Sequence, residues 1–291
     1  MKVKKAVIPA AGLGTRVLPA SKSIPKEMLP IVDKPAIQYI VEEAVAAGIT
    51  EILIITNRGK VAIEDHFDHS FELEAALSKN PEKAEIYKSV QIPANLANIT
   101  FIRQKETGGL GHAVLKAKQF ISGEPFAVLY GDDVILGEDP CVGQLCRAYE
   151  EYGKGVVGIK EVTPQQIKKY SSMKVSPLKD NLYEITDMIE KPKTDADIFS
   201  LFSILGRCVL PAEIFEILEN TPKGAGGELQ LTDAMKTLSR TKGMVGVDFT
   251  GTRYDMGNKF GILKANIDVG LSHPETKEEL AAYIKEIAKT L

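Results

Sequence analysis

The sequence predicts an α/β fold in which helices flank a mixed, mainly parallel sheet, with a small antiparallel extension and helices at the C-terminus. Two observations predict it. Short runs rich in Val and Ile are apolar throughout, as strands that are buried on both faces usually are. Segments with apolar residues at helical spacing separate these runs, and several of them stop at a glycine. Strand, helix and strand in this order indicate parallel strands joined by crossover helices.

The elements follow in order along the chain. The buried strands are predicted at residues 5–10, 51–56, 99–104, 125–131 and 155–162. The helices that connect or cover them are predicted at residues 34–48, 111–123 and 139–153. Residues 60–98 are polar with a helical pattern, so we expect a helical excursion broken at Pro81 and Pro93.

The pattern changes after residue 172. Residues 173–192 predict a hairpin with its turn at Lys179-Asp180-Asn181, and residues 197–210 predict another strand. This part is expected to be either an antiparallel extension or a small second lobe. Residues 277–291 are amphipathic, which predicts a closing helix or a subunit contact.

Charge and cysteine content narrow the class of protein. The net charge of −3 provides no overall field that would favour nucleic acid or an acidic membrane. The three cysteines lack CxxC spacing, which favours a reducing compartment. No run reaches the roughly 20 apolar residues of a membrane span, and the N-terminal apolar stretch breaks at Pro9 and Gly12, too early for a signal peptide. We therefore expect a cytoplasmic protein without a nucleic-acid or membrane partner.

The stretch AAGLGTRVLPASKSIPKEMLPIVDKP, residues 10–35, follows the first strand and contains too many glycines and prolines for regular structure. A dinucleotide-binding turn would need a third glycine where Val17 stands. A P-loop would need Lys followed by Ser or Thr where Thr15-Arg16 stands. Both interpretations are therefore weak.

An anion-binding loop accounts for all of these features. Gly12 and Gly14 allow backbone N–H groups to approach an anion closely. Arg16, Lys22 and Lys26 add positive charge, and the prolines keep the loop ordered before binding. The alternative is a solvated surface loop whose charges have no ligand.

Two further groups of residues follow predicted strands. Asp132 and Asp133 come after the strand at 125–131, where carboxylates suit Mg²⁺; we predict Asp132 as a ligand and Asp133 as its support. Gln104 lies beyond another strand and before a glycine-rich turn, and its amide can pair with the N–H and C=O edge of a base. Two turn-forming aspartates are the alternative for the first pair.

The string G-x-G-T-R-x-x-P followed by P-K-x-x-x-P and K-P resembles the signature of the sugar-1-phosphate nucleotidylyltransferase family. The motifs AIEDHFD, GLGHAV, GDD, EKPK, GAGGELQLTDA and RYDMG follow in the family's order, so the resemblance covers nearly the whole chain. It is greatest to bacterial members that join UTP and glucose 1-phosphate into UDP-glucose and pyrophosphate. The resemblance implies a Rossmann-like fold, Mg²⁺ as cofactor, and a homodimer or homotetramer.

The resemblance also implies an organisation and a set of site residues. Residues 1–291 would form one nucleotidyltransferase domain, with a nucleotide-binding core at 1–170, a sugar-binding part at 171–257 and C-terminal helices at 258–291. The implied nucleotide-binding residues are Ala11, Gly12, Gly14, Thr15, Gln104 and Gly109. The implied catalytic residues are Arg16, Lys26, Asp132 and Lys191. The implied sugar-binding residues are Asp133, Glu190, Lys191 and Glu228, and the implied metal ligands are Asp132 and Asp255.

The chain departs from the family pattern in three places. Thr107-Gly108 stands where Pro-Leu is usual, Leu201 where Asn is common, and Asn258 where Asp is common. Three alternatives therefore stay open: another nucleoside triphosphate or hexose 1-phosphate, a weakly catalytic regulatory protein that binds UDP-glucose, and, disfavoured by Val17, a nicotinamide-dependent oxidoreductase.

Overall fold

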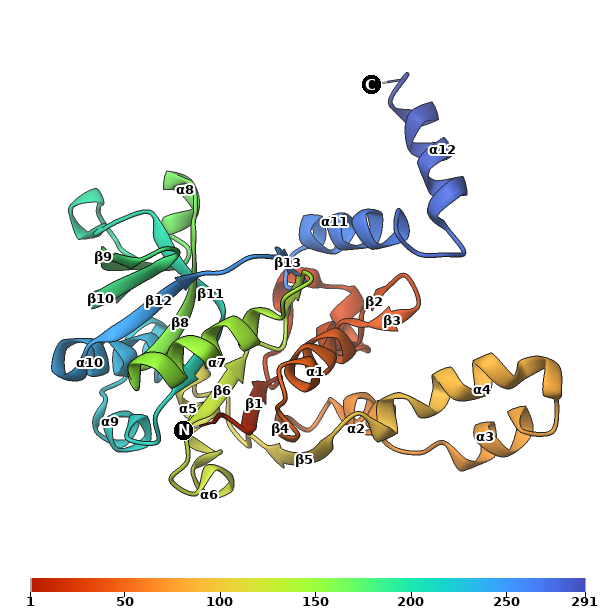
Figure 1. Ribbon diagram of the computed structural model, residues 1–291, viewed down its shortest axis with the longest axis horizontal. Helices are drawn as coiled ribbons and strands as arrows, with labels where there is room; N and C mark the ends of the chain where they lie inside the picture. The colour runs from red at the N-terminus through yellow and green to blue at the C-terminus, as the bar shows by residue number, and fades with distance from the viewer. Residues whose placement is uncertain (1, 291) are drawn as a thin grey trace.

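The computed structural model describes residues 2–290, and within them nine strands form one sheet in the order β5-β4-β1-β6-β11-β8-β12-β10-β9 (Figure 1). These strands are β1 (Lys5–Pro9), β4 (Glu51–Thr56), β5 (Asn98–Arg103), β6 (Phe126–Leu129), β8 (Gly155–Glu161), β9 (Ser171–Lys179), β10 (Leu182–Glu190), β11 (Phe202–Leu210) and β12 (Met244–Asp248). Two small antiparallel ribbons pair β13 (Thr252–Asp255) with β7 (Asp133–Leu136), and β2 (Pro30–Ile31) with β3 (Lys34–Pro35).

The α-helices are α1 (Ala36–Ala46), α2 (Val61–Phe67), α3 (Phe71–Leu77), α4 (Ala84–Gln91), α5 (Leu110–Leu115), α6 (Lys118–Ile121), α7 (Cys141–Tyr152), α8 (Pro164–Ile167), α9 (Ile214–Asn220), α10 (Leu231–Lys242), α11 (Lys259–Gly270) and α12 (Lys277–Ile287). The predicted helix at 111–123 is divided into α5 and α6. The predicted excursion at 60–98 contains α2, α3 and α4, and 3-10 turns begin at Pro81 and Pro93, where the breaks are expected.

The sheet is mixed, and most of its strands run in the same direction, which confirms the predicted fold class. Strands β5, β4, β1 and β6 pair in parallel, and β12 pairs in parallel with β8. Strand β11 is antiparallel to both of its neighbours, β6 and β8. The hairpin β9–β10 adds to the edge at β12, and its turn lies at the predicted position. The antiparallel part is therefore an extension of the same sheet and not a second lobe.

Two helical layers cover the sheet, because successive side chains of each buried strand point to opposite faces. Ala6 and Ile8 of β1 pack in the cluster that contains α1 and α7, whereas Val7 packs with α5, α9 and α10 on the other face. Both clusters contain side chains with no exposed surface. The continuous apolar runs of the sequence are thus explained by burial from both sides.

Helices α3 and α4 extend away from the sheet on one side, and α11 and α12 lead away from β13 (Figure 1). No helix within residues 2–290 is long and apolar enough to cross a membrane. The loops that follow β1, β5 and β6 emerge at one edge of the sheet, which is where ligands of open α/β sheets bind.

Candidate active site

A cavity of about 450 Å³ opens at this edge of the sheet. Its walls include the predicted nucleotide-binding residues Ala11, Gly12, Gly14, Thr15, Gln104 and Gly109, together with Lys26, Asp132 and Glu228. Sequence reasoning missed other lining residues, among them Glu27, Leu110 and Tyr130. Four segments that are far apart in the sequence therefore meet around one space.

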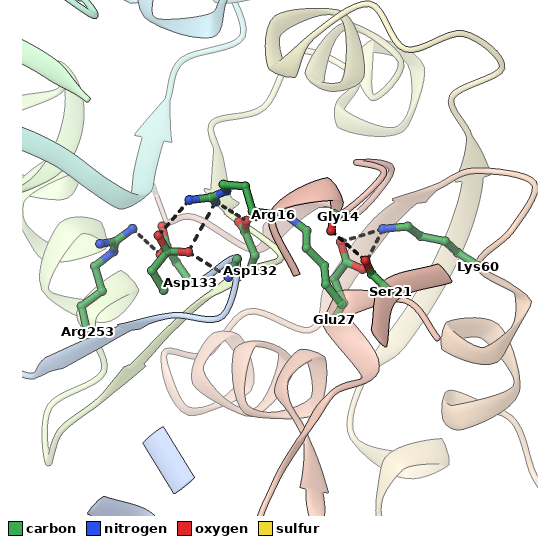
Figure 2. Close-up of polar contacts among 11 residues, drawn as sticks. Gly14, Arg16, Ser21, Glu27, Lys60, Asp132, Asp133 and Arg253 are labelled. Carbon is green, nitrogen blue, oxygen red and sulfur yellow. Dashed lines mark hydrogen bonds and ion pairs between the residues drawn. The ribbon is translucent and has the colours of Figure 1, made fainter. Parts of the chain in front are cut away.

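The loop after β1 is ordered by its own residues. Gly14 has a φ of 69°, a left-handed conformation that favours glycine, and its carbonyl accepts a hydrogen bond from Ser21 Oγ at 2.7 Å (Figure 2). A Cβ on Gly14 would lie 3.1 Å from the Cβ of Ser21. Short 3-10 turns follow at Thr15–Val17, Ala20–Lys22 and Lys26–Met28. The predicted stiff loop is therefore built from consecutive tight turns.

The cations of this loop contact the predicted metal ligands. Lys26 Nζ lies 2.5 Å from Asp132 Oδ2. Arg16 lies 3.6 Å from Asp132 (Figure 2) and 3.3 Å from Asp255. Burial by itself lowers the pKa of Lys26, but Asp132 and Glu27 outweigh it, so that the pKa is raised. Burial by itself raises the pKa of Asp132, but Lys26 and Arg16 overcome it, so that the pKa is lowered. Both partners are charged at neutral pH.

Lys22 does not share this position, although it belongs to the same loop. It is exposed and lines a smaller neighbouring cavity of about 280 Å³, which Gly12 and Lys26 also border, and it does not line the 450 Å³ cavity. Of the three cations that the loop offers, Arg16 and Lys26 are therefore the two brought to the carboxylates.

A buried ion pair that the sequence did not reveal anchors the loop. Lys60 donates to both carboxylate oxygens of Glu27 at 2.7 Å (Figure 2), and the two residues are 5% and 1% exposed. Burial raises the pKa of Glu27 and lowers that of Lys60. Because Lys60 immediately precedes α2, the contact connects the turn that carries Lys26 to that helix. No local pattern distinguishes this glutamate from a solvated one.

Asp133 lies beneath the site and not on the cavity wall. It is 3% exposed, and its Oδ1 lies 2.5 Å from Arg253 Nη2 (Figure 2). A Cβ on Gly206 would come within 2.7 Å of the Asp133 Cβ, so the residue is enclosed on that side as well. Burial, with Asp132 and Asp255 nearby, raises the pKa of Asp133 to about 6 although Arg253 opposes the shift. The structure therefore keeps Asp133, which was expected among the sugar-binding residues, away from the cavity wall, and its supporting role at Asp132 stays a prediction.

The residues expected to bind the sugar lie around the end of β10. Glu190 accepts a hydrogen bond from Thr232 Oγ1 at 2.9 Å, and burial raises its pKa. Lys191 has a φ of 48° and a side chain that is 52% exposed, 3.8 Å from Glu190. Neither lines the 450 Å³ cavity, whereas Glu228 does. Glu190 and Lys191 are therefore close to each other but outside this cavity.

The departure at Asn258 has a structural explanation. Its Oδ1 accepts a hydrogen bond from the Gly261 N–H at 2.8 Å, which caps the N-terminus of α11. An aspartate caps a helix in the same way, so the substitution preserves the helix start next to Asp255.

The donor set at Asp132 and Asp255 fits a magnesium ion. Within residues 2–290 no group of three or more His, Cys, Asp or Glu side chains could hold a metal, but these two carboxylates share the Arg16 guanidinium. Mg²⁺ is usually bound by one or two carboxylates and completes its octahedron with water and substrate phosphates. A Cβ on Gly257 would lie within 3 Å of Arg16 Nη2 and of both carboxylates, so the glycine leaves the room in which these three groups meet.

Comparison with known proteins agrees with this geometry. Residues 5–270 match the family model described as nucleotidyl transferase, and the chain belongs to this family. It is 51% identical over 288 residues, 99% of this chain and 96% of the relative, to UTP–glucose-1-phosphate uridylyltransferase YngB of Bacillus subtilis (strain 168).

Two solved structures are also similar to this chain. A UDP-glucose pyrophosphorylase complexed with UDP-glucose is 41% identical with a TM-score of 0.84, covering 93% of this chain and 100% of that chain. A UTP-bound UGPase from Acinetobacter baumannii is 38% identical with a TM-score of 0.87, covering 98% and 99% respectively.

Proposed function

We propose that the chain transfers uridylyl from UTP to glucose 1-phosphate, giving UDP-glucose and pyrophosphate. The observation that carries the proposal is the cavity at the sheet edge, which combines a glycine-rich loop, an amide suited to a base and a cation–carboxylate cluster. The relatives support the choice of substrates, since those named above are a UTP–glucose-1-phosphate uridylyltransferase, a protein bound to UDP-glucose and a protein bound to UTP.

The reaction needs charge neutralisation more than proton transfer. A phosphate oxygen of glucose 1-phosphate forms a bond to the α-phosphorus of UTP as the bond to pyrophosphate breaks on the opposite side. The attacking phosphate monoester has a second pKa of about 6, so it is mostly ionised at neutral pH and needs no general base. Positioning and opposing charge therefore carry catalysis, as in other phosphoryl transfers.

Arg16 and Lys26 are assigned to the triphosphate, and Lys191 to the phosphate of the sugar. Asp132 and Asp255 are assigned to Mg²⁺, which when bound would neutralise phosphate charge. With a cation at these carboxylates, Arg16 and Lys26 no longer need them as partners and are available to phosphate oxygens. The ion pairs that Arg16 forms with Asp132 and Asp255, and that Lys26 forms with Asp132, are thus the ones that separate when substrate binds.

The base and the sugar are assigned to different loops. Gln104, Gly109 and the backbone of Ala11, Gly12, Gly14 and Thr15 are assigned to the nucleotide. Glu190 and Glu228 are assigned to sugar hydroxyls, with Asp133 acting from beneath through Asp132. This corresponds to a nucleotide-binding core at 1–170, a sugar-binding part at 171–257 and C-terminal helices at 258–291.

A homo-oligomer in the cytoplasm is part of the proposal. Phe260, Leu263 and Ile267 of α11, and Leu271 directly after it, are between 41% and 71% exposed and recur at helical spacing. Tyr283 of α12 is 59% exposed, and no side chain of α12 is buried. A second copy of the chain that covers this apolar stripe would form a homodimer or homotetramer, which light scattering after size-exclusion chromatography measures.

Pyrophosphate release measured for a panel of nucleoside triphosphates and hexose 1-phosphates with Mg²⁺ tests the substrates. We expect the highest kcat/KM with UTP and glucose 1-phosphate. A clear preference for another pair contradicts the proposal, and tight UDP-glucose binding with negligible turnover in excess Mg²⁺ would favour the regulatory alternative.

The metal assignment is tested separately. Asp132→Asn is expected to abolish Mg²⁺-dependent turnover and to weaken Mg²⁺ binding measured by calorimetry in the presence of UTP. Unchanged Mg²⁺ affinity in this variant would remove Asp132 as a ligand.

A further inference from the structure

We propose that His112 is a positioning residue that holds the amide of Gln104 with only its carbonyl oxygen left for a ligand, which makes the cavity select uracil over cytosine. The inference rests on the proposed function, because it concerns the base of the nucleotide substrate. It adds to that function a residue, an orientation and a reason for base choice.

The orientation of the Gln104 amide follows from its neighbours. Nε2 of Gln104 lies 3.3 Å from the carbonyl oxygen of Gly109, and a carbonyl can only accept, so the amide nitrogen must face it. The same Nε2 lies 2.9 Å from Nδ1 of His112. Both N–H groups of the amide therefore have partners, and Oε1 is the polar atom left for a molecule in the cavity that Gln104 lines.

The protonation state of His112 follows from the same contact. A ring nitrogen that receives an N–H must carry a lone pair, so Nδ1 is unprotonated and the neutral ring holds its proton on Nε2. Burial lowers the pKa of His112, and Lys116 and Lys223 lower it further, against an opposing effect of Glu106. Neutral His112 is therefore the form present at neutral pH.

Gly108 provides the room for this ring. A Cβ on Gly108 would lie 2.6 Å from Nδ1 and 3.0 Å from Cβ of His112, so any side chain there displaces the imidazole. The turn cannot easily move away, because the Gly108 carbonyl accepts from Leu229 N–H and Gly111 N–H donates to the Leu229 carbonyl, both at 2.8 Å. The absence of a side chain at Gly108 thus leaves the room in which His112 reaches Gln104.

A fixed carbonyl oxygen distinguishes the two pyrimidines. Uracil has an N–H at N3 and donates to Oε1, whereas cytosine has a lone pair at N3 that Oε1 repels. Sites that leave a polar group unpaired with the wrong substrate can discriminate by a factor of about 10⁴. An amide that is free to rotate by 180° offers its NH₂ to cytosine instead and loses much of this selectivity.

The test compares kcat/KM for UTP and CTP, each with glucose 1-phosphate and Mg²⁺, in the full-length enzyme and three variants. His112→Leu removes the acceptor, and Gly108→Ala displaces the ring without changing it. His112→Asn keeps an acceptor oxygen close to the position of Nδ1. We expect the UTP/CTP ratio to fall at least about tenfold in the first two variants, through a higher KM for UTP, and to stay within about threefold of wild type in His112→Asn.

The inference is overturned if the UTP/CTP ratio of kcat/KM falls less than about tenfold in His112→Leu. It is also overturned if this ratio falls as far in His112→Asn as in His112→Leu. Gly108→Ala provides an independent reading if His112→Leu does not fold. Failure of the proposed function looks different, because the wild-type enzyme itself would then show no preference for UTP.

Discussion

Replacing Arg207 by methionine is expected to destabilise the fold strongly. Arg207 has no exposed surface, and its guanidinium contacts both carboxylate oxygens of Glu43 at distances between 2.6 and 3.2 Å. It also donates to the carbonyls of Gly206 at 2.8 Å and Asp133 at 2.9 Å. Glu43 in turn accepts from the Val142 N–H at 2.8 Å. One ion pair thus connects α1, α7, β11 and the strand that follows Asp132.

The loss in free energy of unfolding is set by the groups that lose a partner in the variant. Arg207→Met leaves the Glu43 carboxylate buried without a cation, a change that costs about 3–5 kcal/mol. The carbonyl of Gly206 keeps a second donor, Tyr130 N–H at 2.9 Å, so it adds little to this cost. Adding Glu43→Gln removes the unpaired charge and keeps an acceptor for Val142. We therefore expect the double variant to regain at least about 2 kcal/mol.

Urea unfolding at pH 7, followed by circular dichroism, measures both values. The comparison is between Arg207→Met and the double variant, since they share the same lost arginine. If Arg207→Met lowers the free energy of unfolding by less than about 1 kcal/mol, or if Glu43→Gln weakens that variant further, the unpaired-charge reasoning is wrong.

Three further predictions concern the site. Lys26→Ala should lower kcat/KM at least about a hundredfold, whereas Lys22→Ala, at an exposed position outside the cavity, should change it less than about threefold; equal effects would contradict the placement. Gly257→Ala, whose Cβ would meet Asp132, Asp255 and Arg16, should weaken Mg²⁺ binding about tenfold or more by calorimetry with UTP present; unchanged affinity would show the space is unused. Because the pKa of His112 is lowered, its neutral form persists below about pH 6.5, and its contact with Gln104 is lost only as the pH falls through that lowered pKa. Over this fall in pH, the KM of the wild-type enzyme for UTP should rise up to about tenfold relative to that of His112→Asn. Parallel pH profiles of KM in the two proteins would refute the role of His112.

Local patterns were sufficient to predict the strands, the parallel part of the sheet and the glycine-rich loop. Continuous apolar runs and helical spacing report burial directly, because each residue's neighbours along the chain determine which face it presents. The hairpin turn at Lys179-Asp180-Asn181 lies where predicted for the same reason. The order of the motifs was sufficient for the family, which the family match confirms.

Long-range contacts lay beyond such patterns. Strand β11 enters the middle of the sheet between β6 and β8, and nothing in its own residues specifies those neighbours. The ion pairs Glu27–Lys60 and Glu43–Arg207 join residues 33 and 164 positions apart, and in the sequence each looks like an ordinary surface charge. His112 reads as a helix residue until the fold brings it against Gln104.

Residue types and their order therefore specify which chemistry this chain can offer, since anion-binding glycines, carboxylates and lysines are visible one position at a time. Their use depends on the packed molecule. The packed structure places Asp133 beneath the site, brings Lys26 and not Lys22 to Asp132, and orients the Gln104 amide. The physical reason is that desolvation and hydrogen-bond geometry arise between segments distant along the chain, and neither exists before the segments meet.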